Sequence, residues 1–455
     1  MVRNARSRSP DKANGRIRVP RQRDDPLDRV SPRRRAKTCA SGPHPSRSRG
    51  PRRCGSCTVS PPRCGEDGMR RSWWLDMAAI VLLAATSSAA MASEPGESVT
   101  ANTSPAPRLI AYLLDRDAPL PPVDAGKLDT VVYSFAVVDA DHRVHLPREG
   151  MAERLTKLAE RRDGAPRADV LLAIGGWGAD HFSEAAATPD ARRTFADTAV
   201  ALVRTHDLDG LDIDWEYPAL PGPGISHSPA DRDTFPLLLQ ALREALDALS
   251  AQTGRRYQLT IAAADGEAAG GLDLPRIVPL VDAIHLMTYD FFGAGSARTG
   301  HHAGLYRSAG ASGASDRDTT RAVDEFLAAG VPPHKLVPGA AFYGKAFRTT
   351  TADNAGLHQP FAGEVAFVTW AELQRGYLDT PVFERHRDPQ AQAAWLWNAG
   401  TRSFVSYESP DAIRAKAAYT RLRGLGGMMF WELGGDDKRG TLLEAAHRGL
   451  RGGDD

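Results

Sequence analysis

Short apolar runs alternate with longer amphipathic stretches along most of the chain, from about residue 108 to about residue 448. The apolar runs have the length and composition of buried strands, and the longer stretches repeat their apolar positions at helical spacing. This pattern predicts strands at 108–114, 130–138, 169–174, 210–216, 257–264, 283–289, 335–342 and 427–431. It predicts helices at 152–160, 191–206, 231–251, 319–329 and 410–422, with Ser228 or Asp231 as the cap of the helix that begins at 231.

The order of these elements indicates the fold class. Eight strands with helices between most of them favour an α/β TIM barrel, the (β/α)8 fold, over the alternative of a doubly wound open sheet. The interval between Phe342 and Gly427 is too long for one crossover, and it contains strand-like pieces at 366–370 and 403–407. We therefore predict a barrel over 108–448, with a small α+β insertion at about 346–408 between strands seven and eight.

The amino-terminal part of the chain departs from this pattern. Residues 1–68 are rich in Arg, Pro and Ser and have almost no apolar run, which predicts a basic disordered extension. The alternatives are a nucleic-acid-binding arm and a partial metal knuckle at Cys54, Cys57 and Cys64. The knuckle lacks a fourth ligand at a suitable spacing.

A secretory signal peptide is predicted at 69–92. Met69 opens a short basic segment, residues 77–85 form an apolar run too short to span a membrane, and residues 90–92 have the small-x-small pattern of a cleavage site. Because a signal peptide works at an N-terminus, we expect Met69 to be the true start and 1–68 to be an over-extended one. Residues 93–107 are expected to form a linker. The mature protein is expected to be secreted, extracellular or periplasmic, and free of the membrane.

Charge and cysteine content differ on the two sides of this boundary. The chain has a formal net charge of +1, but residues 1–68 carry 18 basic and 6 acidic side chains, whereas 93–455 carry 37 basic and 49 acidic ones. All four cysteines precede residue 69. The body therefore has no thiol nucleophile, Cys-ligated zinc or disulfide, and its acidic balance argues against nucleic acid as a partner.

The segment DGLDIDWEYP at 209–218 places three carboxylates on a predicted strand. Because side chains alternate along a strand, Asp212, Asp214 and Glu216 face one way and the apolar residues between them face the other. Carboxylates crowded inside a barrel should keep at least one proton among them near neutral pH. Glu216 comes last, at the carboxyl end of the strand where barrel active sites form, and is a candidate general acid. A solvated edge strand and a Ca²⁺ or Mg²⁺ site are the alternatives.

Five motifs, in order along the chain, resemble those of a known family. DGLDIDWEYP resembles the D-x-x-D-x-D-x-E signature of glycoside hydrolase family 18, the chitinase family. AIGGW at 173–177, LMTYD at 286–290, GAAFYG at 339–344 and GGMMFWE at 426–432 resemble its motifs on strands three, six, seven and eight. The resemblance implies hydrolysis of β-1,4 links between N-acetylglucosamine units with retention. In that family the acetamido group of the substrate forms an oxazolinium intermediate, without a second protein carboxylate as nucleophile.

The resemblance also implies a role for each matching residue. Glu216 would protonate the glycosidic oxygen and then activate water, Asp214 would bind the acetamido N–H, and Asp212 would share a proton with Asp214. Tyr289 would hold the acetamido oxygen, and Trp431 would form the floor of the subsite for the reacting sugar. Six further residues would contact the sugar: Tyr112, Phe135, Trp177, Met287, Asp290 and Tyr217. No metal or other cofactor is implied.

The sequence therefore predicts a secreted, monomeric chitinase acting on chitin or chito-oligosaccharides, in endo or exo mode. The alternatives are an N-acetylglucosaminidase of the same family acting on peptidoglycan or N-glycans, and a catalytically silent chitin-binding lectin. Three residues depart from the family pattern. Ala173 replaces a Ser, which should alter the pH profile, and Lys345 replaces an Arg, which should loosen a substrate contact. His285 stands where Gln or Asn is common.

Overall fold

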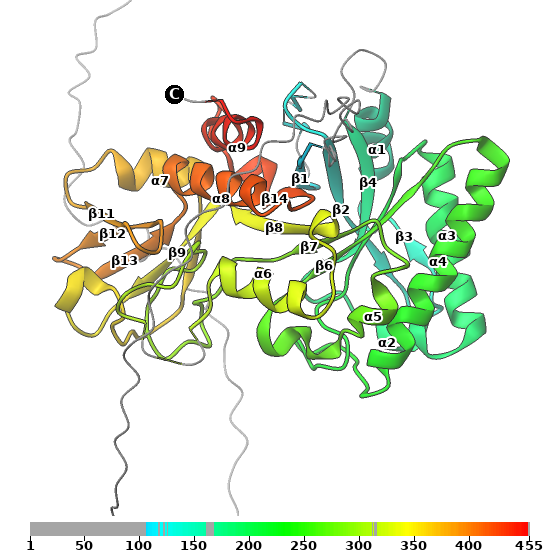
Figure 1. Cartoon of the computed structure of the whole chain (residues 1–455), viewed down its shortest axis with the longest axis horizontal. Helices are drawn as coiled ribbons and strands as arrows, with labels where there is room; N and C mark the ends of the chain where they lie inside the picture. The colour runs from blue at the N-terminus through cyan, green and yellow to red at the C-terminus, as the bar shows by residue number, and fades with distance from the viewer. Residues whose placement is uncertain are drawn as a thin grey trace, which may run out of the picture. The chain divides into compact units, whose positions relative to one another are not determined.

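The computed structural model describes residues 106–453 except 117–118, 122, 125, 161–167, 312 and 314–315 (Figure 1). The predicted extension at 1–68, the predicted signal peptide at 69–92 and most of the predicted linker at 93–107 lie outside the described residues. Among the described residues, no helix is both long enough and apolar enough to cross a membrane.

Eight parallel strands form a closed barrel (Figure 1). They are β1 (Arg108–Leu114), β2 (Thr130–Val138), β4 (Asp169–Gly175), β5 (Gly210–Asp214), β6 (Gln258–Ala263), β7 (Ala283–Leu286), β8 (Leu336–Ala341) and β14 (Gly427–Trp431). Strand β1 pairs with both β14 and β2, which closes the barrel. A short strand, β3 (Val144–His145), adds to β2 in the antiparallel sense. The predicted TIM barrel is confirmed. Four predicted strands are longer than the observed ones: β6 and β8 by one residue at each end, and β5 and β7 at the carboxyl end, because β5 ends at Asp214 and β7 ends at Leu286.

Helices surround the barrel and connect its strands. They are α1 (Met151–Glu160), α2 (Phe182–Ala187), α3 (Pro189–Thr205), α4 (Asp231–Thr253), α5 (Leu274–Ile277), α6 (Thr319–Ala328), α8 (Pro410–Leu422) and α9 (Thr441–Arg451). The predicted cap of α4 is wrong, because its N-cap residue is Ala230 and makes no side-chain cap. Instead, the Asp231 carboxylate accepts the backbone N–H of Ser228 at 2.8 Å and ties down the preceding loop.

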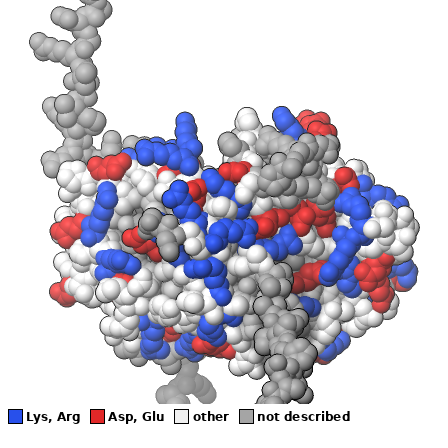
Figure 2. Space-filling view, turned by 45° about the horizontal axis from the view of Figure 1, so that its top comes forward, with Lys and Arg blue, Asp and Glu red and all other residues white. Residues whose placement is uncertain are grey.

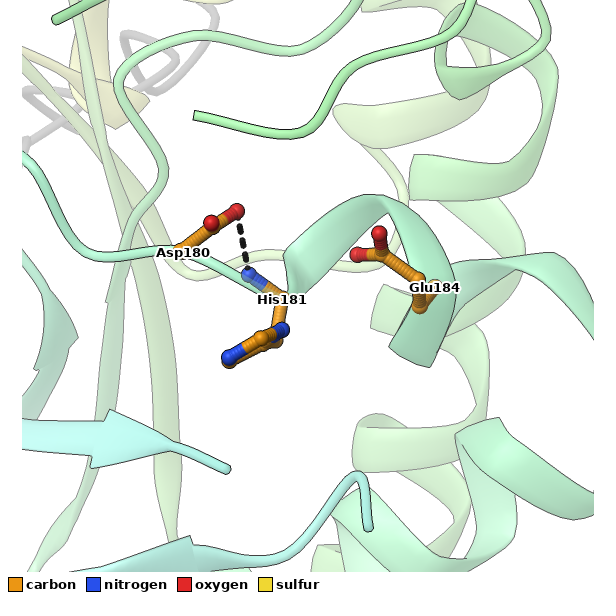
Figure 3. A group of neighbouring side chains, drawn as sticks. All are labelled: Asp180, His181 and Glu184. Atoms are coloured by element: carbon orange, nitrogen blue, oxygen red, sulfur yellow. Dashed lines mark hydrogen bonds between the residues drawn. The ribbon is translucent and has the colours of Figure 1, made fainter. Parts of the chain in front are cut away.

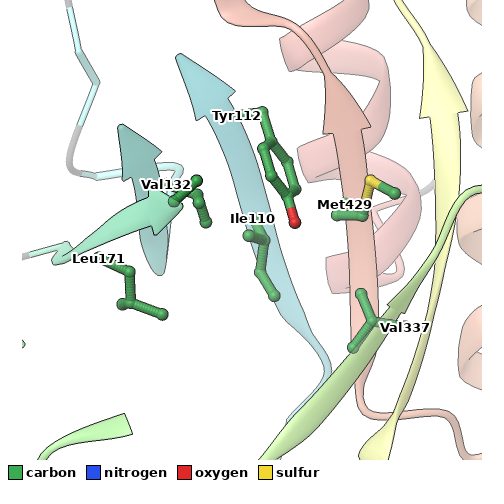
Figure 4. Close-up of a cluster of buried hydrophobic side chains, with 7 residues drawn as sticks. Ile110, Tyr112, Val132, Leu171, Val337 and Met429 are labelled. Atoms are coloured by element: carbon green, nitrogen blue, oxygen red, sulfur yellow. The ribbon is translucent and has the colours of Figure 1, made fainter. Parts of the chain in front are cut away.

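The barrel interior is filled by the alternate residues of its strands. Figure 4 shows one cluster of these side chains, contributed by strands on both sides of the barrel: Ile110, Tyr112, Val132, Leu171, Val337 and Met429. All of these side chains are at most 4% exposed. A packed layer at this level supports the strand ends above it, where barrel active sites form.

An inserted antiparallel sheet follows β8 and precedes the last barrel strand. Its strands are β9 (Tyr343–Arg348), β10 (Ala366–Thr369), β11 (Glu384–Asp388), β12 (Ala393–Asn398) and β13 (Ser403–Tyr407), in the order β10-β9-β13-β12-β11. Its helical parts are a 3-10 turn at Asp353–Gly356 and one short α-helical turn, α7 (Trp370–Leu373), continued by a π turn at Gln374–Leu378. In Figure 1 this sheet lies to one side of the barrel, next to β8 and α8.

Candidate active site

The three predicted carboxylates lie on and just beyond β5. Asp212 is fully buried, and its two oxygens accept hydrogen bonds from the Tyr112 hydroxyl at 2.8 Å and from the Thr260 hydroxyl at 2.5 Å. Asp214 is also buried, and its Oδ1 atom has no hydrogen-bond partner among the described residues. The opposite face of the strand is held by Trp215, which stacks on Phe182 with 5.3 Å between ring centres. The strand therefore directs its acids into the barrel, as the alternation predicts.

Burial and mutual repulsion raise the pKa of two of these acids. The pKa of Asp214 is well above its usual value, mainly because of burial and then because of the negative charges of Glu216 and Asp212. Burial also raises the pKa of Glu216 to about 7, and the charge of Asp290 adds to the rise. Protons are thus retained on this line of carboxyl groups near neutral pH. A carboxyl group with a pKa near 7 suits general acid and base catalysis in the same cycle.

Tyr289 faces the same space from the chain that follows β7. Its pKa is raised well above 10, first by burial and then by the charges of Asp214 and Glu216. The hydroxyl therefore keeps its proton and can donate a hydrogen bond to a substrate oxygen.

A cleft of about 710 Å³ opens above these groups at the carboxyl end of the barrel. Its wall includes ten of the eleven predicted site residues: Tyr112, Phe135, Trp177, Asp214, Glu216, Tyr217, Met287, Tyr289, Asp290 and Trp431. The eleventh, Asp212, lies beneath the cleft and is reached only through its neighbours.

The aromatic residues of the cleft occupy two levels. Trp431 stacks on Phe135 at the floor, with ring centres 5.7 Å apart. Trp177 is 67% exposed at the rim, where Tyr217 meets it edge-on at 6.3 Å. The exposed indole ring of Trp177 presents an apolar face to water beside the cleft, and a ligand can cover this face without any rearrangement of the protein.

The insertion completes one side of the cleft with Lys345, which the sequence analysis linked to a substrate contact, and with Tyr343 and Phe367, which it did not assign to the site. Lys345 pairs with Asp290 at 2.9 Å, and the Tyr343 hydroxyl donates to the same carboxylate at 2.7 Å. Phe367, which is 49% exposed on β10, stacks on Tyr343 with ring centres 4.3 Å apart. The available signal was weak, because Phe367 is a single aromatic residue in a short strand-like piece.

The adjacent histidines His301 and His302, which follow β7, contact different partners. His302 is fully buried, with Nδ1 3.6 Å from Asp290. His301 turns toward the insertion and lies 3.1 Å from Asp388. His301 therefore connects the β7–α6 loop to β11 of the insertion, whereas His302 contacts Asp290 within the same loop.

One group of described residues has metal-ligand spacing, and it consists of Asp180, His181 and Glu184 (Figure 3). The Asp180 carboxylate accepts the backbone N–H groups of His181 at 2.7 Å and of Ser226 at 2.8 Å. These contacts explain Asp180 as a tie between two loops.

Charged side chains of both signs are interspersed on the face shown in Figure 2. Many charged side chains among the described residues pair locally, as Arg317 does with Glu325. The face shown is therefore not dominated by one sign of charge.

The comparisons with known proteins agree with this geometry. Residues 101–436 match the family described as Glycosyl hydrolases family 18. The chain is 36% identical over 305 residues to Chitinase A1 of Niallia circulans, which covers 64% of this chain and 43% of that protein. It is 30% identical to Chitotriosidase-1 of Mus musculus, over 70% of this chain and 69% of that protein. For Chitinase A1, the chain thus spans less than half the length of the relative.

A solved structure gives the same result. The structure of a glycoside hydrolase family 18 N-acetylglucosaminidase from Paenibacillus barengoltzii superposes with a TM-score of 0.70 at 36% identity, covering 75% of this chain and 99% of that one. The family match spans most of the chain and includes the barrel, the acidic strand and the cleft. The chain therefore belongs to glycosyl hydrolase family 18.

Proposed function

We propose that this protein hydrolyses β-1,4-linked N-acetylglucosamine chains, in chitin or chito-oligosaccharides. The observation that carries the proposal is the pair of raised pKa values on Asp214 and Glu216, in a cleft floored by Trp431. Relatives whose names describe them as chitinases support the substrate class.

The reaction we propose is retaining and substrate-assisted. Protonated Glu216 donates its proton to the glycosidic oxygen as the bond to the anomeric carbon breaks. The acetamido carbonyl oxygen of the same sugar forms the new bond to that carbon, which gives an oxazolinium ion. Glu216, now a carboxylate, takes a proton from water as the water opens the ring, and the product keeps the original configuration.

Asp214 and Tyr289 hold the acetamido group in this scheme. The Asp214 carboxyl has an unsatisfied oxygen among the described residues and can accept the acetamido N–H. The Tyr289 hydroxyl, which keeps its proton, can donate to the acetamido oxygen. Holding both ends of the amide places its oxygen against the anomeric carbon, and such orientation lowers the activation barrier.

The first test is turnover of 4-methylumbelliferyl glycosides of N-acetylglucosamine, chitobiose and chitotriose by the wild-type protein and by Glu216→Gln. Wild type should release the fluorophore and the variant should not, while both bind chito-oligosaccharide. An inactive wild-type protein that still binds these sugars would indicate a lectin instead.

A second candidate is an N-acetylglucosaminidase that releases single sugars, and the similarity to the Paenibacillus barengoltzii structure favours testing it. Chromatography of the products from chitohexaose separates the two functions, because a chitinase gives oligomers and an N-acetylglucosaminidase gives the monosaccharide. Peptidoglycan and N-glycoprotein substrates belong in the same assay.

We also propose that the protein is secreted and acts as a monomer without a metal. The segment 69–92 has the pattern of a signal peptide. Expression of the full chain with a carboxyl-terminal tag, followed by sequencing of the mature amino terminus, should place the cleavage after Ala92. Dialysis against EDTA should leave turnover unchanged.

A further inference from the structure

A histidine that the proposed reaction does not use lies under the acidic strand. His285, on β7, is 1% exposed. Its Nδ1 atom is 2.9 Å from the Tyr112 hydroxyl oxygen and 3.4 Å from Oδ1 of Asp212. Because the Tyr112 hydroxyl also contacts Asp212 at 2.8 Å, the three side chains form a closed triangle.

The triangle has two hydrogen-bonding arrangements. The Tyr112 hydroxyl has one proton and can donate to one neighbour at a time. When it donates to ionised Asp212, its oxygen accepts the Nδ1–H of His285. When Asp212 carries a proton and donates it to the Tyr112 oxygen, the hydroxyl donates to a bare Nδ1. The two arrangements hold the same number of protons: in going from the first to the second, the Nδ1 proton of His285 moves to the Tyr112 oxygen as the Tyr112 proton moves to Asp212.

A cavity of about 610 Å³ reaches this triangle from the end of the barrel opposite the cleft. Its wall includes His285 and Thr260, and Thr260 donates to Asp212. Its mouth is at the amino-terminal ends of the strands, where Arg108 begins β1 and Asp169 begins β4. Water can therefore approach His285 without passing the sugar-binding side.

The surroundings of His285 leave it few other partners for a proton. On β5 and β1 the titratable groups that face it are Asp212 and Tyr112. Its neighbours in register on β6 and β8 are Ala262 and Val337, which carry no charge. The charged groups farther out along the cavity wall are Arg108, Asp169, Asp209, Arg255, Arg256, Asp282 and His334.

On its other side, Asp212 has an apolar neighbour on the adjacent strand β4. Ala173 pairs in register with Asp212 across β4 and β5 and offers no hydroxyl. Proton exchange with Asp212 by way of Ala173 is therefore impossible, whereas it is possible by way of Tyr112 and His285.

We propose that His285 is a positioning residue that exchanges a proton with Asp212 through Tyr112, and that it exchanges protons with water in the cavity at the amino-terminal end of the barrel. The inference rests on the hydrolytic function proposed above. A proton placed on Asp212 removes a negative charge beside Asp214, and its return restores that charge. The acidic strand can thus change its proton content while the cleft is filled by substrate.

The kinetic test compares the pH dependence of kcat/KM in wild type, His285→Leu and His285→Asn. Leu removes the donor that favours ionised Asp212, so the acid limb of the profile should move to higher pH by about one unit. Asn offers an amide donor but cannot take up or release a proton, so the limb should stay displaced in this variant; full recovery by Asn would reduce His285 to a hydrogen-bond donor and overturn the proton exchange. The matched control is His206→Leu, which removes another buried histidine bonded to a hydroxyl, that of Thr156 at 2.8 Å, and should not move the limb.

An equal loss of kcat/KM at every pH in folded His285→Leu, with no displacement of the acid limb, would overturn the inference and leave His285 as a packing residue.

A second measurement does not need turnover. In ¹⁵N-histidine spectra, the signals of His285 are identified as those that His285→Asn lacks. In wild type they should show a proton on Nδ1, and the Nδ1 signal should shift in Tyr112→Phe. A neutral ring protonated on Nε2 alone, unaffected by Tyr112→Phe, would also overturn it. If wild type hydrolyses no glycan, the proposed function fails, and these spectra still decide the proton exchange.

Discussion

Replacing Glu216 by Gln should stabilise the folded protein at alkaline pH. Burial is the main reason that the pKa of Glu216 rises from its ordinary 4.5 to about 7. Below pH 4.5 the side chain is protonated in both the folded and the unfolded chain, so its ionisation has no effect on stability. As the pH rises from 4.5 to 7, the unfolded chain ionises first, and the free energy of unfolding falls. Gln cannot ionise, so the variant escapes this loss.

The pKa values set the size of the effect. One pKa unit corresponds to 1.36 kcal/mol, so a rise from 4.5 to about 7 corresponds to about 3 kcal/mol. Water in the open cleft screens part of this, and Glu216 titrates together with Asp214, so about 3 kcal/mol is the upper end. The expected gain for Glu216→Gln is therefore about 1–3 kcal/mol at pH 8 and close to zero at pH 4.

Urea unfolding of wild type and Glu216→Gln at pH 4 and pH 8, followed by tryptophan fluorescence, measures this difference. Glu267→Gln is the matched control, because Glu267 is exposed and the same substitution there should change the free energy of unfolding by less than about 0.5 kcal/mol. If Glu216→Gln gained the same stability at both pH values, or none at pH 8, burial of Glu216 would not be the cause of its raised pKa.

Three further predictions follow from the same structure. The basic limb of the pH profile of kcat/KM should have its midpoint near pH 7, because Glu216 must be protonated to act as the acid; full activity at pH 9 would contradict this. Lys416→Met should lower the free energy of unfolding by about 3–5 kcal/mol, because it leaves Glu408, 2.9 Å away, as an unpaired buried charge. The double variant with Glu408→Gln should recover most of this loss, and calorimetry of both variants measures the two effects. Trp431→Ala should raise KM for chitotriosides about tenfold by removing the stacking face at the cleft floor, whereas an unchanged KM would place the sugar elsewhere.

Period-two alternation was enough to place the acids. It predicted that Asp212, Asp214 and Glu216 share one face. The other face of the strand packs against the helices outside the barrel, as Trp215 does on Phe182 of α2, so the acids face the interior. It did not predict where β5 ends, since the ladder of backbone hydrogen bonds stops at Asp214 although Glu216 still lies in the cleft wall. The bounds of strands depend on their neighbours, which one sequence does not show.

The part of the site formed by the insertion was less predictable. Lys345 was noted as a departure from the family pattern, but its pairing with Asp290 depends on how β9 leaves the end of β8. Phe367 reaches the cleft only because β10 pairs with β9 at the edge of the inserted sheet. Contacts between distant segments of this kind have no local signal. The position of His285 beside Asp212 depends on a strand register across the barrel and was equally hidden.

The most direct test of the central claim is the anomeric configuration of the first product. Proton NMR, recorded within minutes of adding the protein to chitohexaose, distinguishes the α and β anomers before they equilibrate. The oxazolinium route through Asp214 and Glu216 predicts that the β anomer appears first. The α anomer as the first product would contradict substrate-assisted catalysis at this site.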